Sequence, residues 1–397
     1  MKSLKELYKV GKGPSSSHTM GPERACKYFM KAHPDADHFK VVLYGSLALT
    51  GRGHRTDVAI TETLDPHPVK IVFDTKTTDL PHANTMDFFA YKKDELLGQD
   101  RIISVGGGDI RIEGQTSEEK PEIYPEKSFS EIVALCKSRN IRISDYVLEM
   151  EGPGFREFLY DIWQTMKEEI NEGLATTGCL PGDLGVRRVA QVIYNRRHID
   201  ERPETRENRI VCAYAFAASE QNADCKTIVT APTCGSCAVV PSVLKYMQEK
   251  KGFSDEDVLR ALAVGGIVGN VVKRNASVSG AEAGCQAEIG TACAMASAAL
   301  AELFEMGLDQ IEYAAELSLE HHLGLTCDPV CGLVQIPCIE RNAVAAMRAL
   351  NALSLANFLT GTRKISFDMV VRTMYETGKD LHARYKETSE GGLAKLF

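Results

Sequence analysis

The feature that most constrains the fold is a change of residue pattern on either side of a polar, proline-containing stretch. Before it, short β-branched and apolar runs predict strands, and the last run reads as a strand pair around three glycines. These runs span residues 39–49, 69–75 and 101–114. From Phe129 onward, alanine-rich segments follow helical spacing, and strand-like alternation is nearly absent. The pattern predicts an α+β N-terminal domain over residues 1–115, a linker over 116–128 and a large all-α domain over 129–397.

Charge and hydropathy exclude two classes of partner. The net charge of −8, with no basic block, argues against a nucleic-acid-binding protein. The longest apolar run, residues 261–272, contains Gly265 and Gly266 and is shorter than the ~20 residues that a membrane span needs. The N-terminus has no apolar signal-peptide core. We predict a cytoplasmic protein with no nucleic-acid or membrane partner, and the alanine-rich helices predict a homo-oligomer, most simply a dimer.

The twelve cysteines are many for a large chain without secretion signals, where buried thiols and a few metal or catalytic thiolates are expected. Three have distinctive surroundings: Cys285 in SGAEAGCQAEIG, Cys327 in HHLGLTCDPVCG and Cys338 in VQIPCIERNA. Their spacing matches neither a zinc ribbon nor a ferredoxin, so counting alone favours plain buried thiols. The prolines beside Cys327 and Cys338 nevertheless predict helix boundaries, where a thiolate is stabilised.

The loop GPSSSHTMGP, residues 13–22, predicts a binding site for a small anion. Gly21 and Pro22 suit the start of a helix, whose first N–H groups have no internal partners and bind carboxylates, while hydroxyls add donors. The alternative is a serine-rich capping loop without a ligand, which composition alone favours. The candidate binding residues in this loop are Ser15, Ser16, Ser17, His18 and Thr19.

Further polar candidates lie outside this loop. His54, in the glycine-flanked turn TGRGHRTD, suits proton abstraction near neutral pH, and Asp57 would fix its tautomer. Local sequence alone favours a surface-turn histidine instead. The glycines of SVGGGDI offer backbone amides to an anion, although a simple glycine-rich turn is equally compatible. The remaining candidates for substrate binding are Asn84, Gly106, Gly107 and Asn275.

Seven blocks of the sequence together resemble the iron–sulfur-dependent L-serine dehydratases. They are GPSSSHTMGP, YGSLALTGRGHRTD, SVGGGDI, TAPTCGSCAVVP, NASVSGAEAGCQAEIG, EHHLGLTCDPVCGLVQIPCIERNA and TMYETGKDLHARYKETSEGGLA. The resemblance implies a lyase that converts L-serine to pyruvate and ammonium without pyridoxal phosphate. It also implies a [4Fe–4S] cluster held at Cys285, Cys327 and Cys338, with His54 as the base. In this reading the opening loop holds the substrate carboxylate.

The chain departs from the family pattern at four places. Many members end in a cysteine that ligates the resting cluster, whereas this chain ends GGLAKLF. Cys234 and Cys331 stand where asparagine and alanine are usual, so the fourth iron is either open or bound by one of these thiols. Arg55 stands where glycine is common. Alternative functions are the same elimination on threonine or cysteine, and a metal-binding protein without turnover.

Overall fold

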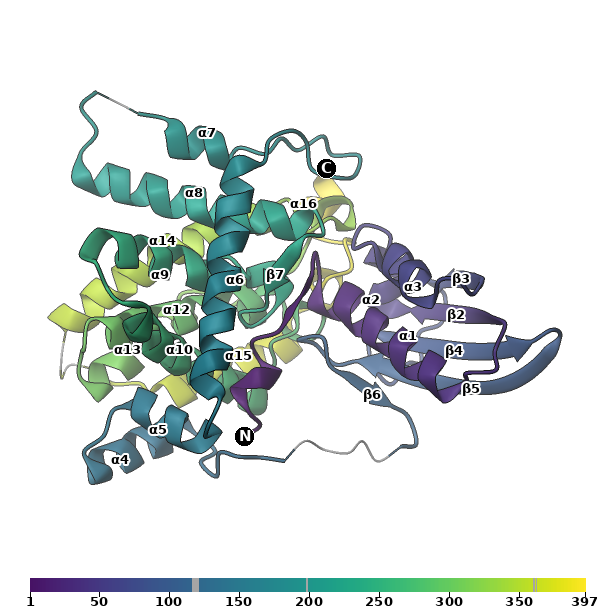
Figure 1. Ribbon diagram of the computed structural model, residues 1–397, viewed down its shortest axis with the longest axis horizontal. Coiled ribbons are helices and arrows are strands. Elements are labelled where there is room, and N and C mark those ends of the chain that lie inside the picture. The colour runs from purple at the N-terminus through teal and green to yellow at the C-terminus, as the bar shows by residue number, and fades with distance from the viewer. Residues whose placement is uncertain (116–120, 198, 360, 362) are drawn as a thin grey trace.

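The computed structural model describes residues 1–115, 121–197, 199–359, 361 and 363–397. Figure 1 shows two parts side by side: a smaller part built around a β-sheet and a larger body of helices. The α+β class of the first part and the helical class of the second are therefore confirmed. The predicted linker falls partly outside the described residues, and the exact domain boundaries stay a prediction.

The N-terminal part is a five-stranded sheet with helices on one face. Strand order is β3-β2-β4-β5-β6, with β2 and β3 parallel and the other neighbours antiparallel. The strands are β2 (His38–Tyr44), β3 (Val69–Asp74), β4 (Thr85–Lys92), β5 (Glu95–Ser104) and β6 (Ile110–Ile112). Helices α1 (Gly21–Ala32) and α3 (Thr56–Leu64) cover it. Phe29 of α1 and Ile60 of α3 share its buried core with alternate strand residues such as Val41 and Phe88.

One predicted strand is only half correct. The run 39–49 begins as β2, but the chain turns at Gly45 and continues as the short helix α2 (Gly45–Thr50). Gly45 has φ 52°, and a Cβ there would lie 2.4 Å from the carbonyl oxygen of Ala83, so only glycine fits this turn. A short apolar run suits a strand or a buried helix equally well, which explains the error. The strand β4 was not predicted, whereas the pair β5–β6 was.

The helical body buries its longest apolar helices at the centre. Every residue of α12 is buried, and the small side chains of α10 allow close contact, since a Cβ on Gly265 would lie 2.9 Å from the Met295 carbonyl oxygen. Its main helices are α4 (Phe129–Arg139), α5 (Ile143–Glu151), α6 (Phe155–Ala175), α8 (Pro203–Ala223), α9 (Val239–Lys251), α10 (Asp255–Asn275), α12 (Thr291–Leu303), α13 (Leu308–Glu320), α14 (Cys338–Phe358) and α15 (Phe367–Asp380). Within the described residues, no helix is long and apolar enough to cross a membrane.

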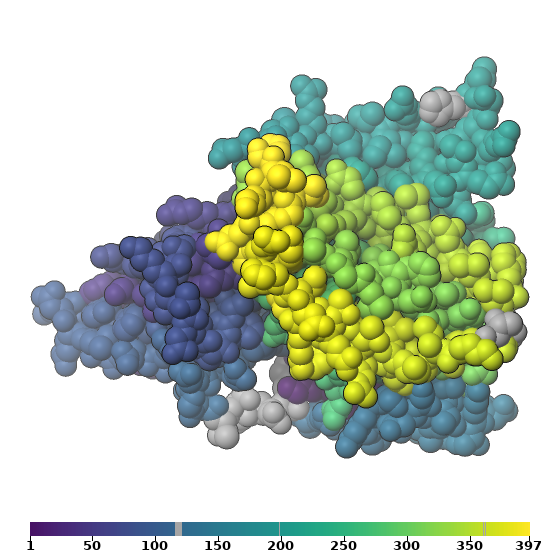
Figure 2. All heavy atoms as spheres, turned by 180° about the vertical axis from the view of Figure 1, so that it is seen from behind, coloured from purple at the N-terminus to yellow at the C-terminus, as the bar shows by residue number. Residues whose placement is uncertain are grey.

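Both ends of the chain join the two parts. The first residues pack into the helical core through Leu4 and Tyr8, and β1 (Val10–Lys12) pairs with β7 (Thr227–Val229). After α15 the tail returns to the boundary between the parts, where Figure 2 shows it in yellow against the purple and blue N-terminal part. The opening loop and the tail therefore meet where the two parts face each other.

Candidate active site

The first histidine of the site, His18, is held in one tautomer by hydroxyl groups. It lies in a wide helical turn (Ser16–Met20) that leads into α1, and the hydroxyl of Ser15 accepts its backbone N–H. Ser46 of α2 donates its hydroxyl to the carbonyl of Glu387 (2.7 Å), so it accepts the proton on Nε2 of His18 (3.0 Å). Ser17 then donates to Nδ1 (2.9 Å). Burial lowers the pKa of His18 to about 4, so its ring is neutral near pH 7.

The second histidine, His54, lies in the turn between α2 and α3 and is almost completely buried. Its Nδ1 is 2.9 Å from the carbonyl oxygen of Thr50, and because a carbonyl only accepts, Nδ1 carries the hydrogen. The ring stacks on His18 with centroids 4.5 Å apart, and Thr19 donates its hydroxyl to the His54 carbonyl. The opening loop therefore positions His54, and Nε2 remains the atom that can take a proton.

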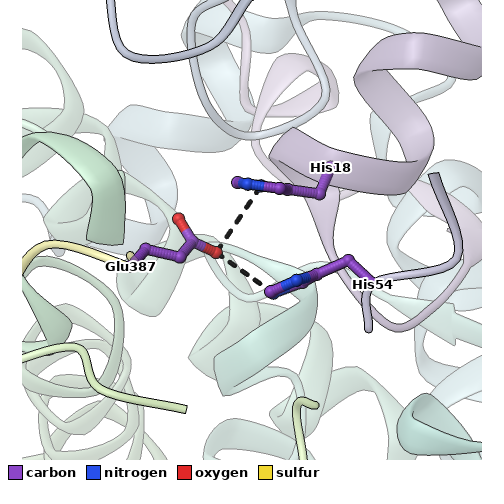
Figure 3. A group of neighbouring side chains, drawn as sticks. All are labelled: His18, His54 and Glu387. Atoms are coloured by element: carbon purple, nitrogen blue, oxygen red, sulfur yellow. Dashed lines mark ion pairs between the residues drawn. The ribbon is translucent and has the colours of Figure 1, made fainter. Parts of the chain in front are cut away.

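A carboxylate from the C-terminal tail completes this group, as Figure 3 shows. Oε1 of Glu387 lies 3.4 Å from Nε2 of His54 and 3.6 Å from Nδ1 of His18. Burial acts to raise the pKa of Glu387, but the two imidazoles, with a smaller contribution from the N–H of Ala281, outweigh it and hold that pKa below its usual value. Sequence reasoning missed this residue, although it lies within the tail segment that carries the family resemblance.

The three predicted cysteines line one small enclosed cavity together with Ser15, His54, Glu288 and Glu387. Cys285 follows α11 (Gly280–Ala283), Cys327 lies in the segment after α13, and Cys338 begins α14. All three are free thiols, and the sulfur atoms of Cys285 and Cys327 and a carboxylate oxygen of Glu288 lie within 4.8 Å of one another. Thiols from three distant segments thus face the same space as His54.

The surroundings of the three thiols shift their pKa values in different directions. A hydrogen bond with Cys327 and the nearby Arg341 guanidinium lower the pKa of Cys285, against the effect of burial. The pKa of Cys327 is raised by the same hydrogen bond, and the pKa of Cys338 by burial. Arg341, one turn into α14, is fixed by the Thr326 carbonyl at 2.6 Å. A half-buried guanidinium therefore lies beside the thiols and can offset negative charge on them.

The backbone around Cys327 is not the predicted helix boundary. The residue lies in an extended segment that forms a bridge with the tail: its N–H donates to the Tyr385 carbonyl and its carbonyl accepts from Glu387, both at 2.8 Å. Cys234 and Cys331, the alternative ligands for the fourth iron, do not line the cavity in the described part of the chain. Cys331 is exposed, and the sulfur of Cys234 faces that of Met20 at 3.4 Å.

Several predicted site residues lie elsewhere. Asp57 does not reach the His54 ring; its Oδ1 accepts the N–H of Val58, and the Thr50 carbonyl fixes the tautomer instead. The cause is local, since Asp57 belongs to α3 whereas His54 precedes it in a turn. Asn275 is exposed and donates to the Lys127 carbonyl.

The predicted glycine pair lies outside the cavity, whereas the opening loop lies partly at it. Gly106 and Gly107 form a left-handed turn at the boundary between the parts, outside the cavity, where Lys9 donates to the Gly107 carbonyl. Of the loop, Ser15 lines the cavity, whereas Ser17 binds the imidazole of His18 and Thr19 the backbone carbonyl of His54. Ser15 also accepts the His18 N–H, so the capping alternative is partly realised as well.

Asn84 is the predicted residue with the strongest unmet hydrogen-bonding capacity. Its side chain is fully buried, and neither its amide oxygen nor its amide nitrogen has a partner among the described residues. The buried hydroxyls of Ser104 and Ser279 are also without partners there. Since a buried polar group without a partner costs free energy, these side chains suit a polar ligand, and substrate binding by Asn84 stays a prediction.

The backbone conformation of Arg55 bears on one departure from the family pattern. It has φ 55°, a left-handed backbone that favours glycine, which accounts for the glycine common at this position. Its side chain lines a separate, open cavity beside α1 and α3, with Lys12 and Lys226.

Known proteins match the chain along nearly its whole length. Residues 136–394 match the family model described as serine dehydratase alpha chain, and residues 3–69 match the one described as serine dehydratase beta chain. The chain is 40% identical to L-serine dehydratase 1 of Escherichia coli, with 99% of each chain covered. It is 38% identical to an L-serine dehydratase of Haemophilus influenzae (99% of each) and to one of Streptomyces coelicolor (99% and 98%).

Proposed function

The chain belongs to the serine dehydratase family, and from this we propose that it is an L-serine ammonia-lyase that forms pyruvate and ammonium. The observation that supports this most is the shared cavity: the imidazole of His54 and the thiols of Cys285, Cys327 and Cys338 line the same enclosed space. Loss of water from serine needs a base at Cα and help for a poor leaving group at Cβ. In the cavity, His54 is the candidate base, and a metal group held by the thiols is the candidate aid to the leaving group.

The thiols suit an iron–sulfur cluster. Such clusters are held by cysteine thiolates, and three free thiols from separate segments, two of them buried and that of Cys338 partly buried, converge here beside Arg341. Cys285, Cys327 and Cys338 would hold the cluster, and since neither Cys234 nor Cys331 lines the cavity among the described residues, these thiols would leave one iron without a cysteine ligand. Such a cluster would supply Lewis acidity, which stabilises negative charge on a leaving hydroxyl group.

In this proposal His54 accepts the proton from Cα of the substrate, and Glu387 stabilises the protonated ring. Nε2 of His54 takes the Cα proton, because Nδ1–H is held by the Thr50 carbonyl. The resulting imidazolium lies beside the Glu387 carboxylate, which stabilises it. As the Cα–H bond breaks, its electron pair forms the Cα=Cβ bond and the Cβ–O bond breaks. The hydroxyl leaves as water with the proton that His54 took from Cα. The product, 2-aminoacrylate, tautomerises to an imine and is hydrolysed to pyruvate and ammonium.

The opening loop binds the substrate carboxylate in this proposal. Ser15 lines the cavity, and its hydroxyl, which accepts the His18 N–H, still has a hydrogen to donate to an anion there. His18 stays neutral and therefore keeps Ser17 and Ser46 in place without competing for the proton. A homodimer and a cytoplasmic location remain predictions.

The test is keto-acid formation by anaerobically purified protein with L-serine, L-threonine and L-cysteine in separate assays. We expect pyruvate from L-serine with the highest kcat/KM. A higher kcat/KM for threonine or cysteine would reassign the substrate. Brown protein with iron and sulfide that forms no keto acid from any of the three would contradict the lyase assignment and favour a non-catalytic metal-binding protein.

A further inference from the structure

The backbone of Glu387 is fixed at the junction of the two parts of the molecule. Its N–H donates to the Cys327 carbonyl at 2.8 Å, and its carbonyl accepts the Ser46 hydroxyl at 2.7 Å. Glu387 also has φ 58°, a left-handed conformation that is unfavourable for non-glycine residues and that clusters at functional sites. The chain thus holds this residue in an unfavourable conformation between a predicted ligand and the helix α2.

The carboxylate of Glu387 is buried with one oxygen unused. Its side chain is 7% exposed and lines the cavity. Oε1 faces the two imidazoles, whereas Oε2 has no hydrogen-bond partner among the described residues. A buried carboxylate oxygen without a donor is expensive, so a ligand that donates to it would be stabilised.

The cavity also lacks a permanent cation for this carboxylate. In the described part of the chain its lining includes no lysine or arginine, and it contains a second carboxylate, Glu288. Of the two imidazoles beside Glu387, the one of His18, whose Nδ1 is 3.6 Å from Oε1, is neutral near pH 7. Glu288 is less free to bind a cation, because Thr233 donates to its Oε1 at 2.7 Å. A positively charged ligand at Oε2 would therefore balance the charge of the Glu387 carboxylate.

We propose that Glu387 binds the α-ammonium group of the amino-acid substrate through Oε2. This inference rests on the proposed function, in which His54 removes the proton from Cα. The ammonium group is attached to that same carbon, and Oε1 of Glu387 is 3.4 Å from Nε2 of His54, so a substrate with its Cα at the base brings its nitrogen to this carboxylate. Glu387 then selects amino acids over hydroxy acids of the same shape.

The experiment compares two ligands that differ only at this group, using anaerobically reconstituted wild-type enzyme and the variant Glu387→Gln. The ligands are L-serine, measured by KM, and 3-hydroxypropanoate, which has hydrogen in place of the ammonium group and is measured as a competitive inhibitor by Ki. We expect the KM for L-serine to rise by about 10- to 100-fold, the usual effect of losing a hydrogen bond to a charged group. The Ki of 3-hydroxypropanoate should change by less than about threefold, because it never reached that carboxylate.

Two further variants control for fold and charge. Glu390→Gln removes an exposed carboxylate from the same tail and should leave both constants unchanged. Glu387→Asp keeps the charge on a shorter side chain and should recover part of the affinity for L-serine. Iron content and absorbance near 400 nm are measured for every variant, so that loss of the cluster is recognised separately from loss of binding.

The outcomes separate this inference from its premise. Equal weakening of L-serine and 3-hydroxypropanoate in Glu387→Gln would overturn the inference and make Glu387 a positioning residue for His54. An unchanged KM for L-serine would also overturn it. A wild-type enzyme that forms no pyruvate would instead overturn the proposed function itself.

Discussion

The two sides of the cavity differ in how their side chains are held. On the N-terminal side, His18 and His54 are fixed by hydroxyls and a carbonyl at 2.9–3.0 Å and stack on each other. On the helical side, the thiols of Cys285, Cys327 and Cys338 come from separate segments and rely on each other and on Arg341. The histidine side is thus fixed by contacts within the protein, whereas in the proposed function a bound cluster completes the cysteine side.

The largest expected effect is therefore on the cysteine side. Cys327→Ala should lose the bound iron and inorganic sulfide and at least about a thousandfold in kcat, because the leaving group is then unassisted. Metal and sulfide analysis of anaerobically purified protein measures the first loss and pyruvate formation the second. Cys331→Ala, an exposed thiol four residues along the chain, is the matched control and should keep both. Normal iron content in Cys327→Ala would remove this residue from the ligand set.

A smaller and different effect is expected on the histidine side. His54→Ala should keep iron and sulfide at wild-type levels but lose about 10²- to 10⁴-fold in kcat, the usual contribution of a general base. His38→Ala, an exposed histidine of the same part, serves as the control. Near-normal turnover in His54→Ala would show that another group takes the proton, and loss of iron would show that the two sides are not independent.

Next in size is an effect of pH on stability. Burial lowers the pKa of His18 from 6.5 to about 4, so the unfolded chain binds a proton more readily, and stability falls as pH falls from about 6.5 to 4. The shift corresponds to about 3 kcal/mol for this residue. His18→Gln should therefore lose less free energy of unfolding over this range than wild type, as denaturant titrations at several pH values would measure. Identical pH dependence in the two proteins would contradict the neutral, buried His18.

The smallest effect is expected at Arg55, outside the cavity. Arg55→Gly removes a left-handed non-glycine residue and should raise the free energy of unfolding by about 0.5–1 kcal/mol, since glycine's own entropy cost offsets part of the gain. Arg52→Gly, in the same turn, loses a contact 4.5 Å above the Phe73 ring and should be destabilising. Thermal unfolding compares the two, and equal destabilisation would mean that the backbone at Arg55 is not strained.

Part of the fold and of the site could be predicted from the sequence, and part could not. The fold classes followed from the change of residue pattern, and the cysteines and His54 from their surroundings and the family blocks. The role of Glu387 was missed in the sequence. Its contact with His18 and His54 depends on a tail that returns across the helical body to the N-terminal part. Asp57 failed for the opposite reason: closeness in sequence suggested a contact that the start of α3 prevents.

The central claim is that both sides of the cavity act on one bound substrate. The most direct measurement is a titration of L-serine into anaerobically reconstituted wild-type protein and His54→Ala, followed by cluster spectroscopy, with iron and sulfide analysis of both. We predict inorganic sulfide in both proteins, a shift of the cluster signal with L-serine in both, and pyruvate at the wild-type rate only from the protein that has His54. Protein without inorganic sulfide, or a cluster signal that L-serine never changes, would contradict the claim.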